Sequence, residues 1–304
     1  MGGTLSRGPC VCASAGDGSF QDISLNEKML TIGSGYSCSG PDRVWLDFRQ
    51  LFQVCWAPGH TVLVADAGNK RIQHRSANTG DLVKMMGEGE LEEPRGVCML
   101  SCGSKLIVAD GEQHDSACLK VFHLSNGSLH SVLPLAKGLL KRPIGLAVSP
   151  DGTMLAVANN LADNVLILNV SDLANPTVVQ VGQHGGGEGE LDRPYDVAFT
   201  PDSQQVAVAD GNNQRIQVFT VDGASVRMFN VGDYVIGVAV GTEGSIVALT
   251  MGQGVKVFSA SGRLLRRRLG GLAVERGGHG GVALDAATGN VAVTDWQQKA
   301  VIIL

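Results

Sequence analysis

The sequence has few aromatic residues, no cysteine pair at C-x-x-C spacing and no long apolar run. Aromatics make up 5% of the 304 residues and charged residues 17%, whereas hydrophobic residues make up 44%, a globular rather than disordered composition. No stretch approaches the ~18 consecutive apolar residues of a membrane-spanning helix. Residues 1–20 lack the apolar core of a secretory signal, so a cytoplasmic location is predicted.

Cysteine, histidine and net charge exclude further classes of site. The net charge of −5 does not favour nucleic acid, because affinity for phosphates comes mainly from Lys and Arg. The seven cysteines are an odd number without zinc-ligand spacing, and no two of the seven histidines share a strand at such spacing. No metal and no cofactor are therefore predicted.

Two nearly identical segments, GEGELEEP at residues 87–94 and GEGELDRP at residues 187–194, lie one hundred residues apart. A phosphate-binding loop needs Lys and Ser or Thr after its last Gly, and here Glu follows. The segments belong instead to a longer internal repeat, because residues 61–97 align with residues 205–238. Repeats of this length indicate a solenoid or a propeller.

Six repeat units start at intervals of about 40 to 50 residues, the spacing of propeller blades. Each unit has four short runs rich in Val, Ile and Ala, bounded by Gly, Asn, Asp or Pro, as β-strands are. The second run is apolar on both faces, which fits a sheet between two neighbouring sheets. We therefore predict an all-β fold, a closed β-propeller of four-stranded antiparallel blades, most simply with six blades.

Closure of the ring requires the two ends of the chain to meet. The sixth unit stops after its third run at Leu304, and KMLTIGSG at residues 28–35 resembles the missing fourth strand. This divides the chain into an N-terminal segment, residues 1–27, and a propeller, residues 28–304. Residues 10–33 also align with three strands of another unit, so a seventh, incomplete blade is the alternative.

The segments VADGNNQRIQVFTVDG (residues 208–223) and VADAGNKRIQHR (residues 64–75) resemble the NHL repeat. That resemblance implies a closed propeller, usually of six blades, that serves mostly as an interaction platform. Some relatives bind RNA and a few are lyases. The predicted function is a non-catalytic protein–protein interaction scaffold, with an RNA-binding module as the alternative and a hydrolase or lyase as a remote one.

An Asp closes the second run in most units, which raises the question of a catalytic or metal-binding ring. Asp before a Gly/Asn turn commonly binds its own backbone, and one such role per blade explains one Asp per blade. Arg71 and Arg215 follow two of these Asp by five residues. The predicted structural turn residues are Asp66, Arg71, Asp110, Asp210, Arg215 and Asp295.

The connections between blades carry the predicted partner site. Strand order places the repeated acidic loops and the starts of the first strands on one face, around the mouth of the central channel. An acidic face attracts a basic partner segment. The candidates are Glu88, Glu90, Glu188 and Glu190 on the loops and Arg95, Arg142, Arg193, Tyr195 and His279 at the mouth. The chain itself is expected to be a monomer.

Two further surfaces are candidates. Arg266, Arg267 and Arg268 form the strongest local site for a polyanion, although charge on an outer strand also discourages edge-to-edge pairing. The N-terminus MGGTLS fits the acceptor pattern for myristoylation of Gly2, and Cys10 and Cys12 could carry a second acyl chain. Membrane association through the N-terminus is thus an open alternative.

Overall fold

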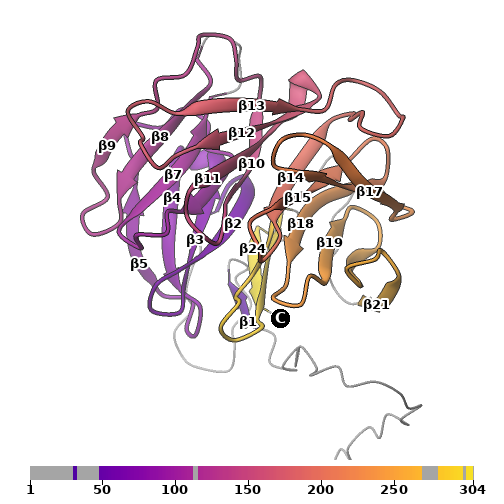
Figure 1. The fold of residues 1–304 in the computed structure, drawn as a ribbon. Helices are drawn as coiled ribbons and strands as arrows, with labels where there is room; N and C mark the ends of the chain where they lie inside the picture. The colour runs from indigo at the N-terminus through magenta and orange to yellow at the C-terminus, as the bar shows by residue number, and fades with distance from the viewer. Residues whose placement is uncertain (1–29, 33–47, 112–115, 269–279, 297–298, 304) are drawn as a thin grey trace, which may run out of the picture.

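A computed structural model describes residues 30–32, 48–111, 116–268, 280–296 and 299–303. In these residues the chain forms six four-stranded antiparallel sheets arranged in a ring, a six-bladed β-propeller (Figure 1). Two short 3₁₀ turns, η1 (Ala67–Asn69) and η2 (Asn160–Ala162), are the helical elements of the described chain. The predicted all-β propeller with six blades is confirmed, and the described residues form no seventh blade.

The blades follow one another along the chain, each from its innermost to its outermost strand. Blade 1 has β2 (Leu51–Ala57), β3 (Thr61–Asp66), β4 (Arg71–Ser76) and β5 (Leu82–Met86). Blade 2 has β6 (Gly96–Met99), β7 (Lys105–Asp110), β8 (Cys118–His123) and β9 (Leu129–Val132). Blade 3 has β10 (Pro143–Val148), β11 (Met154–Asn159), β12 (Asn164–Asn169) and β13 (Thr177–Val181).

The remaining blades repeat this order. Blade 4 has β14 (Pro194–Phe199), β15 (Gln205–Asp210), β16 (Arg215–Thr220) and β17 (Ser225–Asn230). Blade 5 has β18 (Val235–Val240), β19 (Ile246–Thr250), β20 (Gly254–Phe258) and β21 (Leu264–Arg268). Blade 6 has β22 (Val282–Leu284), β23 (Val291–Asp295), β24 (Ala300–Ile303) and β1 (Leu30–Ile32).

Burial explains why the second strand of each blade is apolar throughout. In β15, Val206 to Asp210 are all buried, since this strand lies between two other strands and both of its faces contact neighbouring blades. The outermost strand β17 instead alternates half-buried and exposed residues. The outermost strand of this blade is therefore more exposed to solvent than its second strand.

The ring closes through the N-terminal strand. β1 pairs antiparallel with β24, with Leu30 opposite Ile303 and Ile32 opposite Val301. Figure 1 shows β1, in indigo, beside β24, in yellow. Blade 6 therefore joins segments from the two ends of the chain, which shields the outer edge of β24 from solvent and from other chains.

Apolar side chains fill the centre of the propeller. One buried cluster takes a residue from each of the six innermost strands: Phe52, Val97, Ile144, Tyr195, Ile236 and Val282. The innermost strands are thereby tied into a single core. No helix among the described residues is long and apolar enough to cross a membrane.

Candidate functional site

The Asp at the end of a second strand clips the incoming connection to its blade. Asp210 is fully buried, and its Oδ1 accepts a hydrogen bond from the backbone N–H of Asp192 at 2.8 Å. Its Oδ2 accepts from Arg215 Nε at 2.7 Å and from Asn213 Nδ2 at 3.0 Å. The carboxylate therefore joins the connection from blade 3, the turn after β15 and the start of β16.

Blades 1 and 2 use the same clip. Asp66 accepts from the backbone N–H of Arg49 at 3.0 Å and from Arg71 Nε at 3.2 Å. In blade 2, Lys120 takes the place of the Arg, and its Nζ lies 2.7 Å from Asp110 Oδ2. Asp110 also accepts the backbone N–H groups of residues 92 and 93. In blade 6, Asp295 is buried at the matching position.

Arg215 extends the clip of blade 4 into the second acidic loop. Its Nη1 donates to the carbonyl of Gly186, and its Nη2 to the carbonyls of Gly187 and Glu190, each at 2.8 Å. Gly189 N donates to Gln217 Oε1 at 3.0 Å. One side chain thus fixes three carbonyls of this loop, so its backbone is held before any partner arrives.

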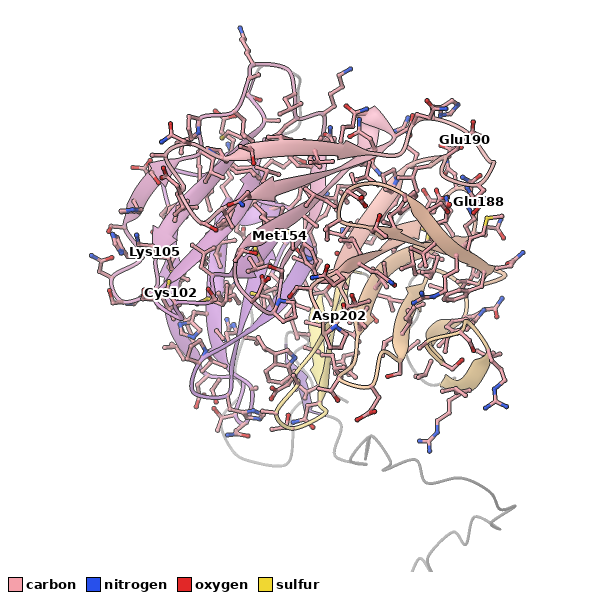
Figure 2. All side chains as sticks on the ribbon, in the orientation of Figure 1. Cys102, Lys105, Met154, Glu188, Glu190 and Asp202 are labelled. Atoms are coloured by element: carbon pink, nitrogen blue, oxygen red, sulfur yellow. The ribbon has the colours of Figure 1, made fainter. Side chains whose placement is uncertain are left out.

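Three of the four candidate glutamates on these loops are exposed to solvent. The side chain of Glu88 is 71% exposed, and Glu90 and Glu188 are also exposed. Glu190 is half-buried because its Oε2 accepts from Gly187 N at 2.8 Å. Figure 2 shows Glu188 and Glu190 on the same part of the surface. Negative charge is presented on loops with low conformational freedom.

The mouth candidates Arg95 and Tyr195 lie inside the protein. Arg95 is 1% exposed, forms an ion pair with Glu93 and lies over the ring of Phe52. Tyr195 packs edge-to-face on Tyr234, with ring centroids 5.4 Å apart, and burial raises the pKa of the Tyr234 hydroxyl. Both side chains pack within the hub, the central part of the propeller formed by its six innermost strands. Little of either side chain is therefore left for a partner.

Arg142 and Arg193 occupy equivalent positions in neighbouring blades, directly before β10 and β14. Both have left-handed backbones, with φ of 54° and 55°. The Arg142 carbonyl accepts from Asn160 N and the Arg193 carbonyl from Gly211 N. Both residues are half-buried, and the Nε atom of Arg142 is itself buried.

The other candidates lie elsewhere or outside the described residues. Arg266 is exposed on β21, far along the chain from the acidic loops, and the side chains of Arg267 and Arg268 are outside the described set. His279, Gly2, Cys10 and Cys12 also fall outside the described residues. The partner, polyanion and lipid assignments of these residues remain predictions.

A polar network within the hub was missed by the sequence analysis. Gln53 Nε2 donates to the carbonyl of Leu146 at 2.8 Å and to Asp196 Oδ1 at 3.0 Å. Gln53 Oε1 accepts from the backbone N–H groups of Val97 and Leu146. Asp196 Oδ2 accepts from Val238 N at 3.0 Å. Two side chains therefore connect the inner strands of blades 1 to 5.

Asp196 has an unusual protonation equilibrium. Burial raises the pKa of its carboxyl to about 8, although hydrogen bonds from Val238, Val197 and Gln53 oppose the shift. Gly145 makes room for the group, since a Cβ there would lie 2.3 Å from Asp196 Oδ1. The carboxyl is 2% exposed, so its position suits cohesion of the hub rather than contact with a substrate.

A second cluster that sequence spacing did not reveal lies at the junction of blades 3 and 4. Asp163, His184 and Asp192 each offer a ligand atom, and these atoms lie within 4.8 Å of one another. His184 Nδ1 is 3.1 Å from Asp163 Oδ2. The signal in the sequence was the extra stretch of residues before the second GEGEL segment, which carries His184.

Comparison with known families supports the propeller and adds an enzyme family. Residues 122–242 match the family model described as lactonase, 7-bladed beta-propeller. The match covers less than half of the chain, from blade 2 to blade 5, and the described chain has six blades where that description has seven. A search of curated proteins gives no match. The NHL resemblance is not confirmed by these comparisons.

Proposed function

We propose that this propeller is a protein-binding scaffold whose two acidic loops, residues 87–94 and 182–194, bind a basic segment of a partner. One observation carries the proposal: buried Asp–base pairs fix the backbones of both loops while Glu88, Glu90 and Glu188 stay exposed. A surface fixed in advance loses less conformational entropy when a partner binds.

The proposal places the partner contact on the two acidic loops and not on the residues at the mouth of the central channel. Tyr195 was a candidate for partner contact at the channel mouth, but it is only 9% exposed and belongs to the buried cluster of the innermost strands. Glu90 and Glu188 are exposed, whereas Glu88 lies 4.0 Å from Arg71 Nη1, a pair that a cationic segment would share or displace. Complementary charge of this kind mainly raises the association rate and sets specificity.

The test compares two charge-matched double variants. Glu88→Gln with Glu188→Gln removes one charge from each loop, and the control, Asp222→Asn with Glu243→Gln, removes two exposed charges from turns at the opposite end of the blades. The probe is a Lys/Arg-rich model peptide, and association is measured by biolayer interferometry over a range of salt concentrations. We expect slower association and a flatter salt dependence in the loop variant alone.

Equal effects of the two double variants would overturn the proposal, because the interaction would then reflect net charge only. Binding of a single-stranded RNA oligonucleotide that is lost in Arg266→Gln would favour the RNA-binding alternative. Crosslinking of the bound peptide to loop residues, read by mass spectrometry, provides an independent position for the contact.

Hydrolysis of a cyclic ester is the second candidate function, supported by the lactonase family match over residues 122–242. The group best suited to the chemistry is His184, whose Nδ1 lies 3.1 Å from Asp163, because a carboxylate can orient an imidazole that acts as a general base toward water. Turnover of a panel of γ- and δ-lactones in a pH-stat tests it. Turnover that disappears in His184→Ala would favour a lactone hydrolase over a protein-binding scaffold.

A further inference from the structure

The cluster at the junction of blades 3 and 4 draws its members from separate loops. Asp163 follows η2 and has a left-handed backbone with φ of 51°. His184 and Asp192 belong to the connection between β13 and β14. One nitrogen and two carboxylate oxygens thereby converge from two blades, within 4.8 Å of one another.

The position of His184 depends on a lengthening of its connection. The first acidic connection has residues 87–94 between β5 and its Pro, and the second has residues 182–194, so the second is longer by five residues (13 − 8). A backbone bridge joins His184 to Leu191, and Leu191 N donates to the carbonyl of Gln183 at 2.7 Å. The extra residues therefore fold back along the loop and bring the imidazole to the two carboxylates.

Among the described residues, no Lys or Arg forms an ion pair with either carboxylate, and His184 is the one basic group beside them. Asp163 Oδ1 accepts from the backbone N–H of Arg193 at 2.8 Å, and its other oxygen faces the imidazole. Asp192 Oδ1 accepts from the neutral amide of Asn212 at 2.8 Å. In the part of the chain that the structure describes, Asp192 forms no ion pair with Lys or Arg. Two negative groups this close repel each other, and a bound dication would turn that repulsion into attraction.

We propose that Asp163, His184 and Asp192 bind one divalent first-row transition-metal ion. The nitrogen donor favours Zn²⁺ over Ca²⁺ or Mg²⁺, which take oxygen ligands, and Mn²⁺ suits the carboxylate and water oxygens of the same set. The side chain of His184 is 72% exposed, so water completes the coordination shell. This ion ties the second acidic loop to η2 of blade 3, a role that does not depend on the scaffold function.

Mn²⁺ is the probe of choice, because Mn²⁺ binds weakly to the chain's thiols, which prefer Zn²⁺. The full-length protein is titrated with MnCl₂, and free Mn²⁺ is measured by electron paramagnetic resonance. We expect one saturable site per chain and a loss of affinity of about tenfold or more in His184→Ala and in Asp192→Asn. ZnCl₂ should displace the Mn²⁺, as the Irving–Williams order requires.

Two matched controls separate this site from surface charge in general. His60→Ala removes a His whose Nδ1 lies 3.7 Å from Asp285, a His–Asp pair that has no third ligand among the described residues. Glu188→Gln removes an exposed acid from the same loop as His184. Both should bind Mn²⁺ like the parent protein, and circular dichroism verifies that every variant is folded. Absence of a saturable site, or equal loss in the control variants, would overturn the proposal.

Discussion

The buried carboxyl of Asp196 should make the stability of the propeller depend on pH. Burial raises its pKa from the ordinary 3.8 to about 8. At ~1.36 kcal/mol per pKa unit, a shift of roughly four units corresponds to a change on the order of 5 kcal/mol in the free energy of unfolding. Between about pH 4 and about pH 8 the folded protein keeps the proton that the unfolded chain releases. The free energy of unfolding therefore falls as pH rises through this window.

Asp196→Asn removes the titration while keeping the shape of the side chain. The amide oxygen can still accept from Val197 N and from Gln53 Nε2, as Asp196 Oδ1 does. The amide NH₂ then faces the backbone N–H of Val238, which loses its acceptor, at a cost of about 1–3 kcal/mol. We expect the variant to be less stable than the parent near pH 5, and the difference to shrink or reverse by about pH 9.

Urea unfolding of both proteins at a series of pH values, followed by circular dichroism, measures this difference. Groups other than Asp196 titrate alike in the two proteins, so the difference between the two stability curves isolates the Asp196 carboxyl. The exposed acid Asp222, replaced by Asn, is the control for the loss of one surface carboxylate. Parallel curves for Asp196→Asn and the parent would refute the assigned protonation state.

Three further results are expected. Arg215→Met should destabilise the protein by about 3–5 kcal/mol in urea unfolding, because it leaves the buried carboxylate of Asp210 without its cation; an unchanged midpoint would contradict the clip. Deletion of residues 1–35 removes β1 and should lower the melting temperature and promote aggregation through the exposed edge of β24, and an unaltered cooperative transition would argue against closure by β1. Cys102 should react with iodoacetamide before Cys98 in a peptide-mapping time course. Although partial burial opposes it, hydrogen bonding to Ser104 lowers the pKa of the exposed Cys102 thiol, whereas burial raises that of Cys98; equal rates would contradict the assignment.

The fold was predictable because its information is local and repeated. A strand that is apolar on both faces and ends in Asp before a Gly/Asn turn recurs along the chain, and each copy specifies the same four-stranded sheet. Even the strand that closes the ring had a local cue, since residues 28–35 resemble the fourth strand of a unit and residues 30–32 pair with β24. Because the same unit recurs, a weak copy such as that of blade 5 can be aligned with the strong copies and assigned the same four strands.

The hub network was not predictable to the same degree, because Gln53 and Asp196 are 143 residues apart and belong to different blades. The cue was present but weak: each is a polar residue within an otherwise apolar first strand. A first strand lines the crowded centre of the ring, where a polar side chain must find partners on other blades. The burial of Tyr195 was not predictable for a related reason, since its position in the chain indicated the channel mouth but not that its ring would pack in the central cluster.

Two features at the junction of blades 3 and 4 depart from the repeat. The left-handed residue before the third strand is Lys70 in blade 1 and Gln214 in blade 4, but Asp163 in blade 3. The connection that leaves blade 3 is also the lengthened one, and it carries His184 to that Asp. A residue that recurs in blade after blade, such as the clipping Asp, is explained by the blade itself. The repeat does not explain why two such departures meet within 4.8 Å of each other.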